Sequence, residues 1–303
     1  RLSMHQATNS PEKKRIIASM HRLRQARSDL EKKVRDQLLA RSTGLAKGLP
    51  RPLLTWEFET DAHEASGLIE GALKDGAKIE NGRLILDGKK GYAQTTRLFR
   101  DLGARTVEVW AAVSDFTSRG GGLLTIERAD GSSFDSIVFG EREAGKWIAG
   151  SDSFRRTRNL KAPPESAASS GDLTHLAIVY AEDGTITVYR NGRVYGDSYK
   201  PSGPQSELQT YKKGQSSFLF GKRHTGGGRP FFAGEIDEAR VYDRALSAEE
   251  LLASFTAGPM GIPLSSVLAG MTDAQRAERA QLNCALEQEQ KAYEAASMRP
   301  KAY

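Results

Sequence analysis

The chain has 303 residues, of which 38% are hydrophobic and 27% charged, a composition typical of soluble globular domains. Its single cysteine, Cys284, excludes an internal disulfide and a thiolate metal site, and no apolar run approaches the roughly 20 residues that span a bilayer. The net charge of +6 is concentrated in residues 1–41, where eleven Lys and Arg residues face four Asp and Glu residues. Because the sequence opens on Arg1 and stops at Tyr303 without a terminating pattern, we expect a segment of a longer protein.

Residues 12–41 are predicted to form one long helix that Gly44, Gly48 and the following prolines end. Apolar residues recur there at steps of three and four in a heptad-like stripe, namely Ile16, Met20, Leu23, Leu30, Val34 and Leu38. The basic surplus can attract nucleic acid or an anionic membrane, or it can form a solvated helix face. The helix has no aromatic residue for base stacking, so nucleic-acid binding is not expected.

Strand-like runs alternate with turn signals over the next two hundred residues, without intervening helices. The clearest runs are Leu53–Glu59, Arg83–Asp87, Thr106–Val113, Gly122–Glu127, Leu173–Ala181, Thr185–Arg190, Ser217–Phe220 and Glu235–Tyr242. Such a succession of short strands predicts an antiparallel β-sandwich.

Two dipeptides between strands, Asp183-Gly184 and Asn191-Gly192, indicate hairpins, since both central residues of a type I′ turn need positive φ. Within Thr106–Val113 the valines and Ala111 alternate with Glu108 and Trp110, which predicts one apolar face.

Two capping boxes mark helices at the C-terminal side of the sandwich. Ser247 with Glu250 begins a short helix, and Thr272 with Gln275 begins a helix over residues 272–296. The expected domains are therefore a basic helix and linker (1–52), a β-sandwich (53–258), and a linker with a C-terminal helix (259–303). The first and last helices are each marginal alone, so we expect them to pair as an antiparallel coiled-coil stalk.

One stretch carries a family resemblance: Phe231-Phe232-Ala233-Gly234-Glu235-Ile236-Asp237-Glu238-Ala239-Arg240-Val241-Tyr242-Asp243-Arg244-Ala245-Leu246-Ser247. It resembles the closing signature of laminin-G-like domains of the concanavalin-A-like superfamily. Thr106–Trp110 resembles an early core strand of that family, and Leu176–Gly192 its central hairpin, although Thr174-His175 stands where many members have Trp-His. The resemblance implies a mainly β fold, an antiparallel jelly-roll β-sandwich over about residues 53–256.

A narrower resemblance rests on Lys146–Thr157, Phe220–His224 and the flanking helices. These are similar to the laminin-G-like insert of large planctomycete multidomain proteins that also carry cytochrome-c-like domains. The resemblance implies an exported parent, periplasmic or on the cell surface, in which neighbouring domains are possible partners.

The acids Glu235, Asp237 and Glu238 are the place to look for catalysis, because related jelly rolls include glucanases. Retaining glycosidases need two carboxylates about 5 Å apart on one face. In a regular strand Glu235 and Asp237 share a face and Glu238 points away, while Ala239 replaces the next carboxylate of the glucanase pattern. We therefore expect no enzyme.

Calcium needs several oxygen ligands; the resemblance favours Asp237, with Asp61 as a second candidate.

A carbohydrate site needs an aromatic platform with polar neighbours. Trp147 is the candidate platform, with the alternative that it belongs to the core. Arginine binds carboxylate or sulfate through its planar fork, and the candidate contacts for an anionic glycan are Arg155, Arg156, Lys222, Arg223 and His224.

Two functions follow. The first is a non-catalytic, lectin-like carbohydrate-binding module of a larger exported protein, with calcium as a possible cofactor. The second is a structural spacer or protein-interaction module with no small ligand. They differ in whether the candidate rim residues are exposed together.

Overall fold

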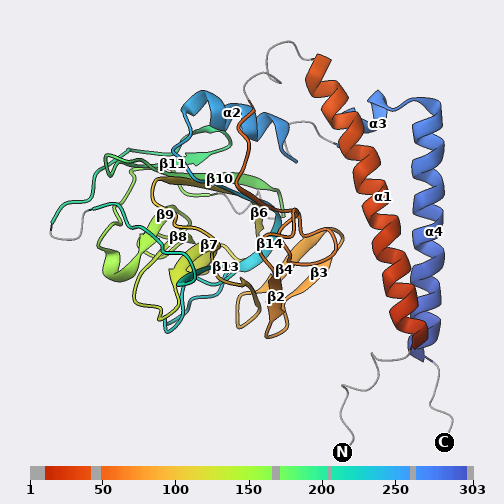
Figure 1. Ribbon diagram of the computed structural model, residues 1–303, viewed down its shortest axis with the longest axis horizontal. Coiled ribbons are helices and arrows are strands. Elements are labelled where there is room, and N and C mark those ends of the chain that lie inside the picture. The colour runs from red at the N-terminus through yellow and green to blue at the C-terminus, as the bar shows by residue number, and fades with distance from the viewer. Residues whose placement is uncertain (1–10, 42–48, 166–170, 204–206, 260–263, 299–303) are drawn as a thin grey trace, which may run out of the picture. The chain divides into compact units, whose positions relative to one another are not determined.

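The computed structural model describes the chain outside residues 1–10, 42–48, 166–170, 204–206, 260–263 and 299–303. It divides into two compact units (Figure 1): Arg1–Ala46 together with Ile262–Tyr303, which is helical, and Lys47–Gly261, which is the sandwich. None of the helices described is long and apolar enough to cross a membrane.

The sandwich consists of two antiparallel sheets. The strands are β1 (Leu54–Trp56), β2 (Gly71–Lys74), β3 (Lys78–Glu80), β4 (Arg83–Asp87), β5 (Tyr92–Thr95), β6 (Arg105–Val113), β7 (Gly121–Arg128), β8 (Phe134–Phe139), β9 (Trp147–Ser151), β10 (Thr174–Tyr180), β11 (Ile186–Arg190), β12 (Arg193–Val194), β13 (Ser216–Phe220) and β14 (Ala233–Tyr242). One sheet has the order β12-β11-β10-β6-β14-β4-β3, with β1 also on β14, and the other β2-β5-β13-β7-β8-β9. This is the predicted mainly β jelly-roll sandwich.

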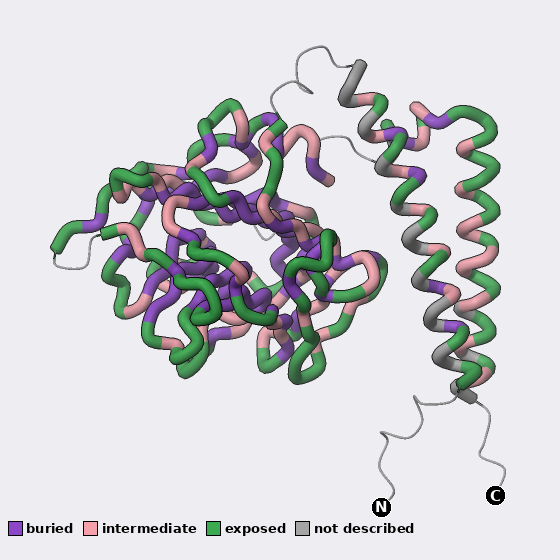
Figure 2. The backbone as a smooth tube through the Cα atoms, in the orientation of Figure 1, coloured by how far each residue is buried: buried purple, intermediate pink, exposed green. Residues whose placement is uncertain are grey.

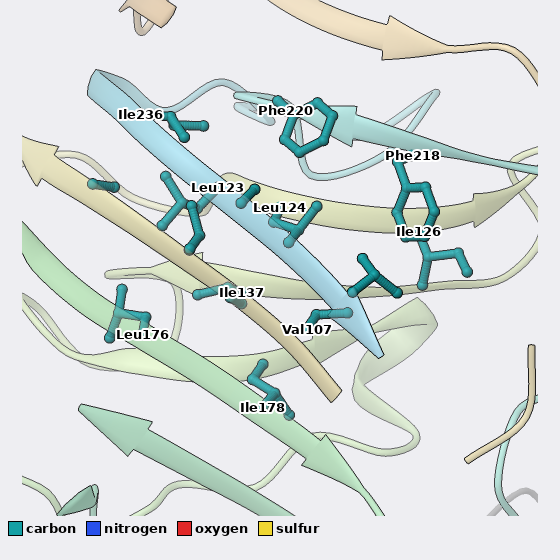
Figure 3. Close-up of a cluster of buried hydrophobic side chains, with 14 of the residues drawn as sticks. Val107, Leu123, Leu124, Ile126, Ile137, Leu176, Ile178, Phe218, Phe220 and Ile236 are labelled. Atoms are coloured by element: carbon teal, nitrogen blue, oxygen red, sulfur yellow. The ribbon is translucent and has the colours of Figure 1, made fainter. Parts of the chain in front are cut away.

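The core lies between the sheets because each strand alternates its side chains. In β6, Val107, Val109 and Ala111 enter the core as predicted, while Glu108 and Trp110 lie on the opposite face. Figure 3 shows core side chains from both sheets, and Figure 2 shows how burial follows the strands. The hairpin at Asn191-Gly192 has φ of 51° and 71°, as a type I′ turn requires. At the other hairpin only Gly184 has positive φ, so Asp183 does not adopt the expected conformation.

A β-bulge interrupts β14 beside β6. Ile236 pairs with Ala111 but Glu238 pairs with Trp110, which leaves Asp237 as the extra residue. Ile236 and Ala239 are buried, whereas Asp237 and Glu238 are both partly exposed. The prediction that Glu238 points away from Asp237 is therefore wrong, because a bulge breaks the two-residue alternation of a regular strand.

The short helix α2 (Ala248–Ala257) covers the outer face of the larger sheet. It begins with the predicted capping box, in which the Ser247 side chain accepts the Glu250 N–H and Glu250 accepts that of Ser247. Leu251 is fully buried against Ala177 and Tyr242 of the sheet. The capping box provides hydrogen-bond partners for the first turn of α2, and its apolar face packs on the sandwich.

The helical unit contains α1 (Pro11–Arg41), α3 (Leu264–Gly270) and α4 (Asp273–Met298). α1 and α4 lie side by side and run antiparallel (Figure 1): Ser19 bonds Glu289 at 2.6 Å, while Glu31 lies 2.7 Å from Arg279. The predicted stripe faces this contact, since Leu30 and Val34 are buried with residues of α3 and α4. The two helices pair as expected, and the supercoil of a coiled coil stays a prediction.

Candidate ligand-binding pocket at one end of the sandwich

A pocket of about 550 Å³ opens where three segments distant in sequence meet. These are the turn between β7 and β8, the turn that follows β9, and the segment 207–210. The pocket is lined by Arg128, Ser132, Ser133, Asp152, Arg155, Arg156, Glu207, Leu208, Gln209 and Thr210. The lining is almost entirely polar, so the pocket suits a ligand with many hydrogen-bonding groups.

A buried ionic cluster around Asp135 supports one wall of the pocket. Its Oδ2 accepts hydrogen bonds from Arg105 and from the Tyr211 hydroxyl, the latter at 3.0 Å. Its Oδ1 accepts one from Arg156 Nε at 3.0 Å. Arg105 and Asp135 are almost completely buried, so each charge is neutralised by a partner, as burial requires.

Arg156 connects this cluster to the pocket. Its guanidinium also donates to Asp152 Oδ1 at 2.7 Å and to the Phe134 carbonyl at 3.0 Å. Burial lowers the Arg156 pKa, but the charges of Asp135 and Asp152 outweigh this and raise it. Arg156 is thus a largely buried residue of the pocket wall that also lines the pocket, and its predicted contact with a ligand stays a prediction.

Arg155 and Arg128 are the accessible cations of the pocket, with side chains 46% and 45% exposed. Arg155 lies 3.4 Å from Asp152 Oδ2 and Arg128 lies 3.9 Å from Asp130, both long contacts for ion pairs. Their guanidinium groups therefore keep hydrogen-bonding capacity for a ligand. Arg155 was predicted from the sequence, and Arg128 was missed because it reaches the pocket only through the β7–β8 turn.

Trp147 does not form the expected platform. Its side chain is 1% exposed, packs against Phe139 at 4.7 Å between ring centroids, and donates its indole N–H to Glu165 at 2.8 Å. The first residue of β9 points into the core because β9 alternates, so the core alternative holds.

The side chains of the basic run Lys222-Arg223-His224 make contacts within the protein. Lys222 lies 4.2 Å from the Tyr92 ring centroid, and Arg223 pairs with Glu141. His224 stacks on Phe134 at 4.2 Å, and burial together with the neighbouring Arg223 and Lys222 charges lowers its pKa to about 4. None of the three lines the pocket, and His224 is neutral at physiological pH, so this run does not supply the predicted cationic contacts.

The two acids expected to bind calcium are not brought together with further ligands. Asp237 lies 3.1 Å from Arg83 Nε, and Glu235 lies 2.8 Å from the same guanidinium. Asp61 is exposed and accepts the His63 N–H at 2.8 Å. In the described part of the chain no group of three or more His, Cys, Asp or Glu residues could hold a metal ion. The Arg83 guanidinium pairs with Asp237 but not with Asp61, and calcium binding stays a prediction.

A second buried cluster, under α2, contains residue types that often act in catalysis. Glu108 accepts hydrogen bonds from the hydroxyls of Ser254 and Tyr242, each at 2.6 Å, and bonds His175 Nε2 at 2.9 Å. His175 Nδ1 accepts the Gly192 N–H at 3.3 Å, so Nε2 carries the proton that points to Glu108. Glu108 and His175 are fully buried. Ser254 is also fully buried, so a substrate would have no direct access to its hydroxyl, and the cluster suits a structural role.

Comparison with known proteins agrees with this architecture. Residues 87–252, more than half of the chain, match the family described as the concanavalin A-like lectin/glucanases superfamily, and the chain belongs to that family. No curated protein matches the chain. Members of the family include both lectins and glucanases, so membership leaves the activity to be argued from the site.

Several solved structures are similar over about two thirds of the chain. Trypanosoma rangeli sialidase is 13% identical with a TM-score of 0.49, over 68% of this chain and 33% of that one. The binding domain of botulinum neurotoxin serotype D is 14% identical with a TM-score of 0.46, over 67% of this chain and 51% of that one. The receptor binding domain of the C/D mosaic serotype is 15% identical with a TM-score of 0.48, over 67% and 50%. The chain spans a third to a half of these proteins, and the likeness concerns the fold alone.

Proposed function

We propose that the sandwich is a non-catalytic carbohydrate-binding module that holds an anionic glycan in the pocket at the β7–β8 turn. The observation that carries the proposal is Arg155, an accessible guanidinium on the wall of a preformed polar pocket. Arg128 supplies a second accessible cation. A planar guanidinium binds carboxylate or sulfate in bidentate fashion, so acidic sugars match this pocket.

The wall that carries Arg155 is rigid before any ligand arrives. The next residue, Arg156, is held by Asp135 and Asp152, and its N–H bonds Ser151 Oγ at 2.9 Å. A wall anchored in this way loses little conformational entropy on binding, which favours affinity. Ser132, Gln209 and Thr210 add neutral polar groups around the two cations.

The non-catalytic part of the proposal rests on the acids of β14. Arg83 bonds both Glu235 and Asp237, and Glu238 bonds Arg240 Nε at 2.5 Å. A retaining glycosidase needs two carboxylates that face the substrate, whereas each of these three acids is paired with a guanidinium group. These acids therefore suit a structural role in the sheet.

The test is binding of the whole chain to an array of neutral, sulfated and uronic-acid glycans, once with calcium and once with a chelator. We expect acidic glycans to bind, and Arg155→Gln to weaken them about tenfold through loss of a charge-assisted hydrogen bond. The matched control is Arg158→Gln, since Arg158 is exposed three residues further along the chain, bonds Ser202 and does not line the pocket. Loss of glycan binding in the presence of the chelator would indicate that calcium takes part in the site.

A blank array would contradict the proposal and leave the spacer function, which the pairing of α1 with α4 favours. In that function the helical unit would position neighbouring domains of a larger exported protein. Equal losses in Arg155→Gln and Arg158→Gln would also contradict it, because they would indicate attraction by general surface charge.

A further inference from the structure

Phe154 is an exposed aromatic residue on the same turn as two lining residues of the pocket. It is 42% exposed, although phenylalanine is normally buried. It ends the short helix η3 (Asp152–Phe154), between Asp152 and Arg155, which both line the pocket. The turn therefore presents an apolar ring beside the accessible guanidinium.

The backbone at this turn is unfavourable for a bulky side chain. Ser153 and Phe154 have φ of 49° and 56°, in the left-handed region that glycine and asparagine tolerate best. The surrounding bonds impose this shape: the Arg155 N–H bonds the Asp152 carbonyl and the Thr157 N–H bonds the Phe154 carbonyl, both at 3.1 Å. The backbone of the turn needs a residue that tolerates the left-handed region at 154, and nothing in that requirement favours an aromatic side chain.

The Phe154 ring reaches toward a second cation. Arg142 lies over it, with the guanidinium carbon 5.4 Å from the ring centroid. Arg142 is exposed and belongs to the loop between β8 and β9, at the opposite end of β9 from the pocket. β9 is an edge strand of five residues, roughly 15 Å long. Arg155 lines the pocket, while Phe154 and Arg142 contact each other beside it as exposed side chains.

We infer that Phe154 and Arg142 form a second subsite, which takes the next sugar units of a linear acidic oligosaccharide whose first unit occupies the pocket. The inference rests on the proposed function. The C–H groups on one face of a pyranose carry partial positive charge and match the negative face of an aromatic ring. Arg142 supplies a fork for the next carboxylate. The ligand class is therefore an oligosaccharide that repeats acidic units, not a single sugar.

The experiment is calorimetric titration of the whole chain with galacturonic acid and with tetragalacturonate. We expect the wild-type chain to bind the tetrasaccharide more tightly than the monosaccharide. Phe154→Ala should lower the affinity for the tetrasaccharide about tenfold and leave that for the monosaccharide unchanged, because one aromatic stacking contact is removed. Phe154→Trp should keep the gain with chain length. The control, Leu252→Ala, removes an exposed apolar side chain from α2 and should change neither value.

The outcomes separate the two proposals. If the wild-type chain binds both sugars equally, or Phe154→Ala keeps the gain with length, the second subsite is refuted while the pocket stands. If neither sugar nor any array glycan binds, the proposed function fails, and the subsite with it. A fall in both affinities in Phe154→Ala would show that the ring supports the pocket itself, which also overturns the inference.

Discussion

Two buried carboxylates of the sandwich, Glu108 and Asp135, differ in their surroundings. Glu108 lies under α2, where Ser254, Tyr242 and His175 satisfy it and all of these groups are buried. Asp135 lies in a cluster whose outermost member, Arg156, lines a pocket. Both clusters neutralise buried charge, and the second includes a residue that lines the pocket described above.

In these two clusters the residue types do not indicate which one is functional. Burial of the side chains and the hydrogen bonds that they make with one another are the better guide. The Glu108 cluster contains serine, histidine and glutamate, yet these three side chains are fully buried and bond one another. The Asp135 cluster anchors Arg156, the neighbour of the accessible Arg155 in the pocket wall.

The largest expected change in stability follows from a substitution that disrupts the Asp135 cluster. Arg156→Met should destabilise the sandwich by about 3 kcal/mol, because it removes one of the cations that neutralise a buried carboxylate. Arg155→Gln should change stability by less than about 0.5 kcal/mol, since its side chain is half exposed. Urea unfolding followed by tryptophan fluorescence measures this, because Trp56, Trp110 and Trp147 all lie in the sandwich. Equal stability changes would show that the pocket wall does not depend on the cluster.

A smaller effect is expected in the sealed cluster. Glu108→Gln should cost about 2 kcal/mol at pH 7, since it weakens hydrogen bonds to a charged acceptor. Burial would raise the pKa of Glu108, but the His175 hydrogen bond and the Arg240 charge lower it below its ordinary value. A carboxyl with a lowered folded pKa stabilises the fold above the unfolded value and loses this on acidification. The stability gap between wild type and Glu108→Gln should therefore narrow at pH 3, with the exposed Glu182→Gln as control; a constant gap would contradict this.

A further expected effect concerns His224 and depends on pH. Its pKa of about 4 in the folded state lies below the unfolded value of about 6.5. The unfolded chain therefore binds a proton first, and stability should fall as the pH drops from about 6.5 toward 4. His224→Phe keeps the stack on Phe134 and cannot titrate, so its stability should be flatter over that range. A parallel pH profile for the variant would place the acid sensitivity elsewhere.

Much of the fold could be predicted from the sequence, because period-two alternation, turn dipeptides and capping boxes act locally. β6, the Asn191-Gly192 hairpin and the start of α2 all follow from such signals. The bulge at Asp237 could not be predicted in this way, since the register depends on the partner strand β6.

The site was predictable only in part. Arg155 was found because its segment has a recognisable sequence, but Arg128 and Gln209 join it only through the tertiary fold. Trp147, the predicted platform, is buried, whereas Phe154, for which no role was predicted, is exposed on a turn with positive φ. Neither exposure nor positive φ is visible in the residue type.

The most direct measurement is a two-dimensional NMR titration of the whole chain with tetragalacturonate, which reports where the ligand binds. The account predicts shifts of the backbone amides of Ser132, Gln209 and Thr210, which surround the pocket, and none near Ser254 under α2. Shifts confined to the helical unit, or saturating at the basic helix α1, would contradict a glycan site in the sandwich.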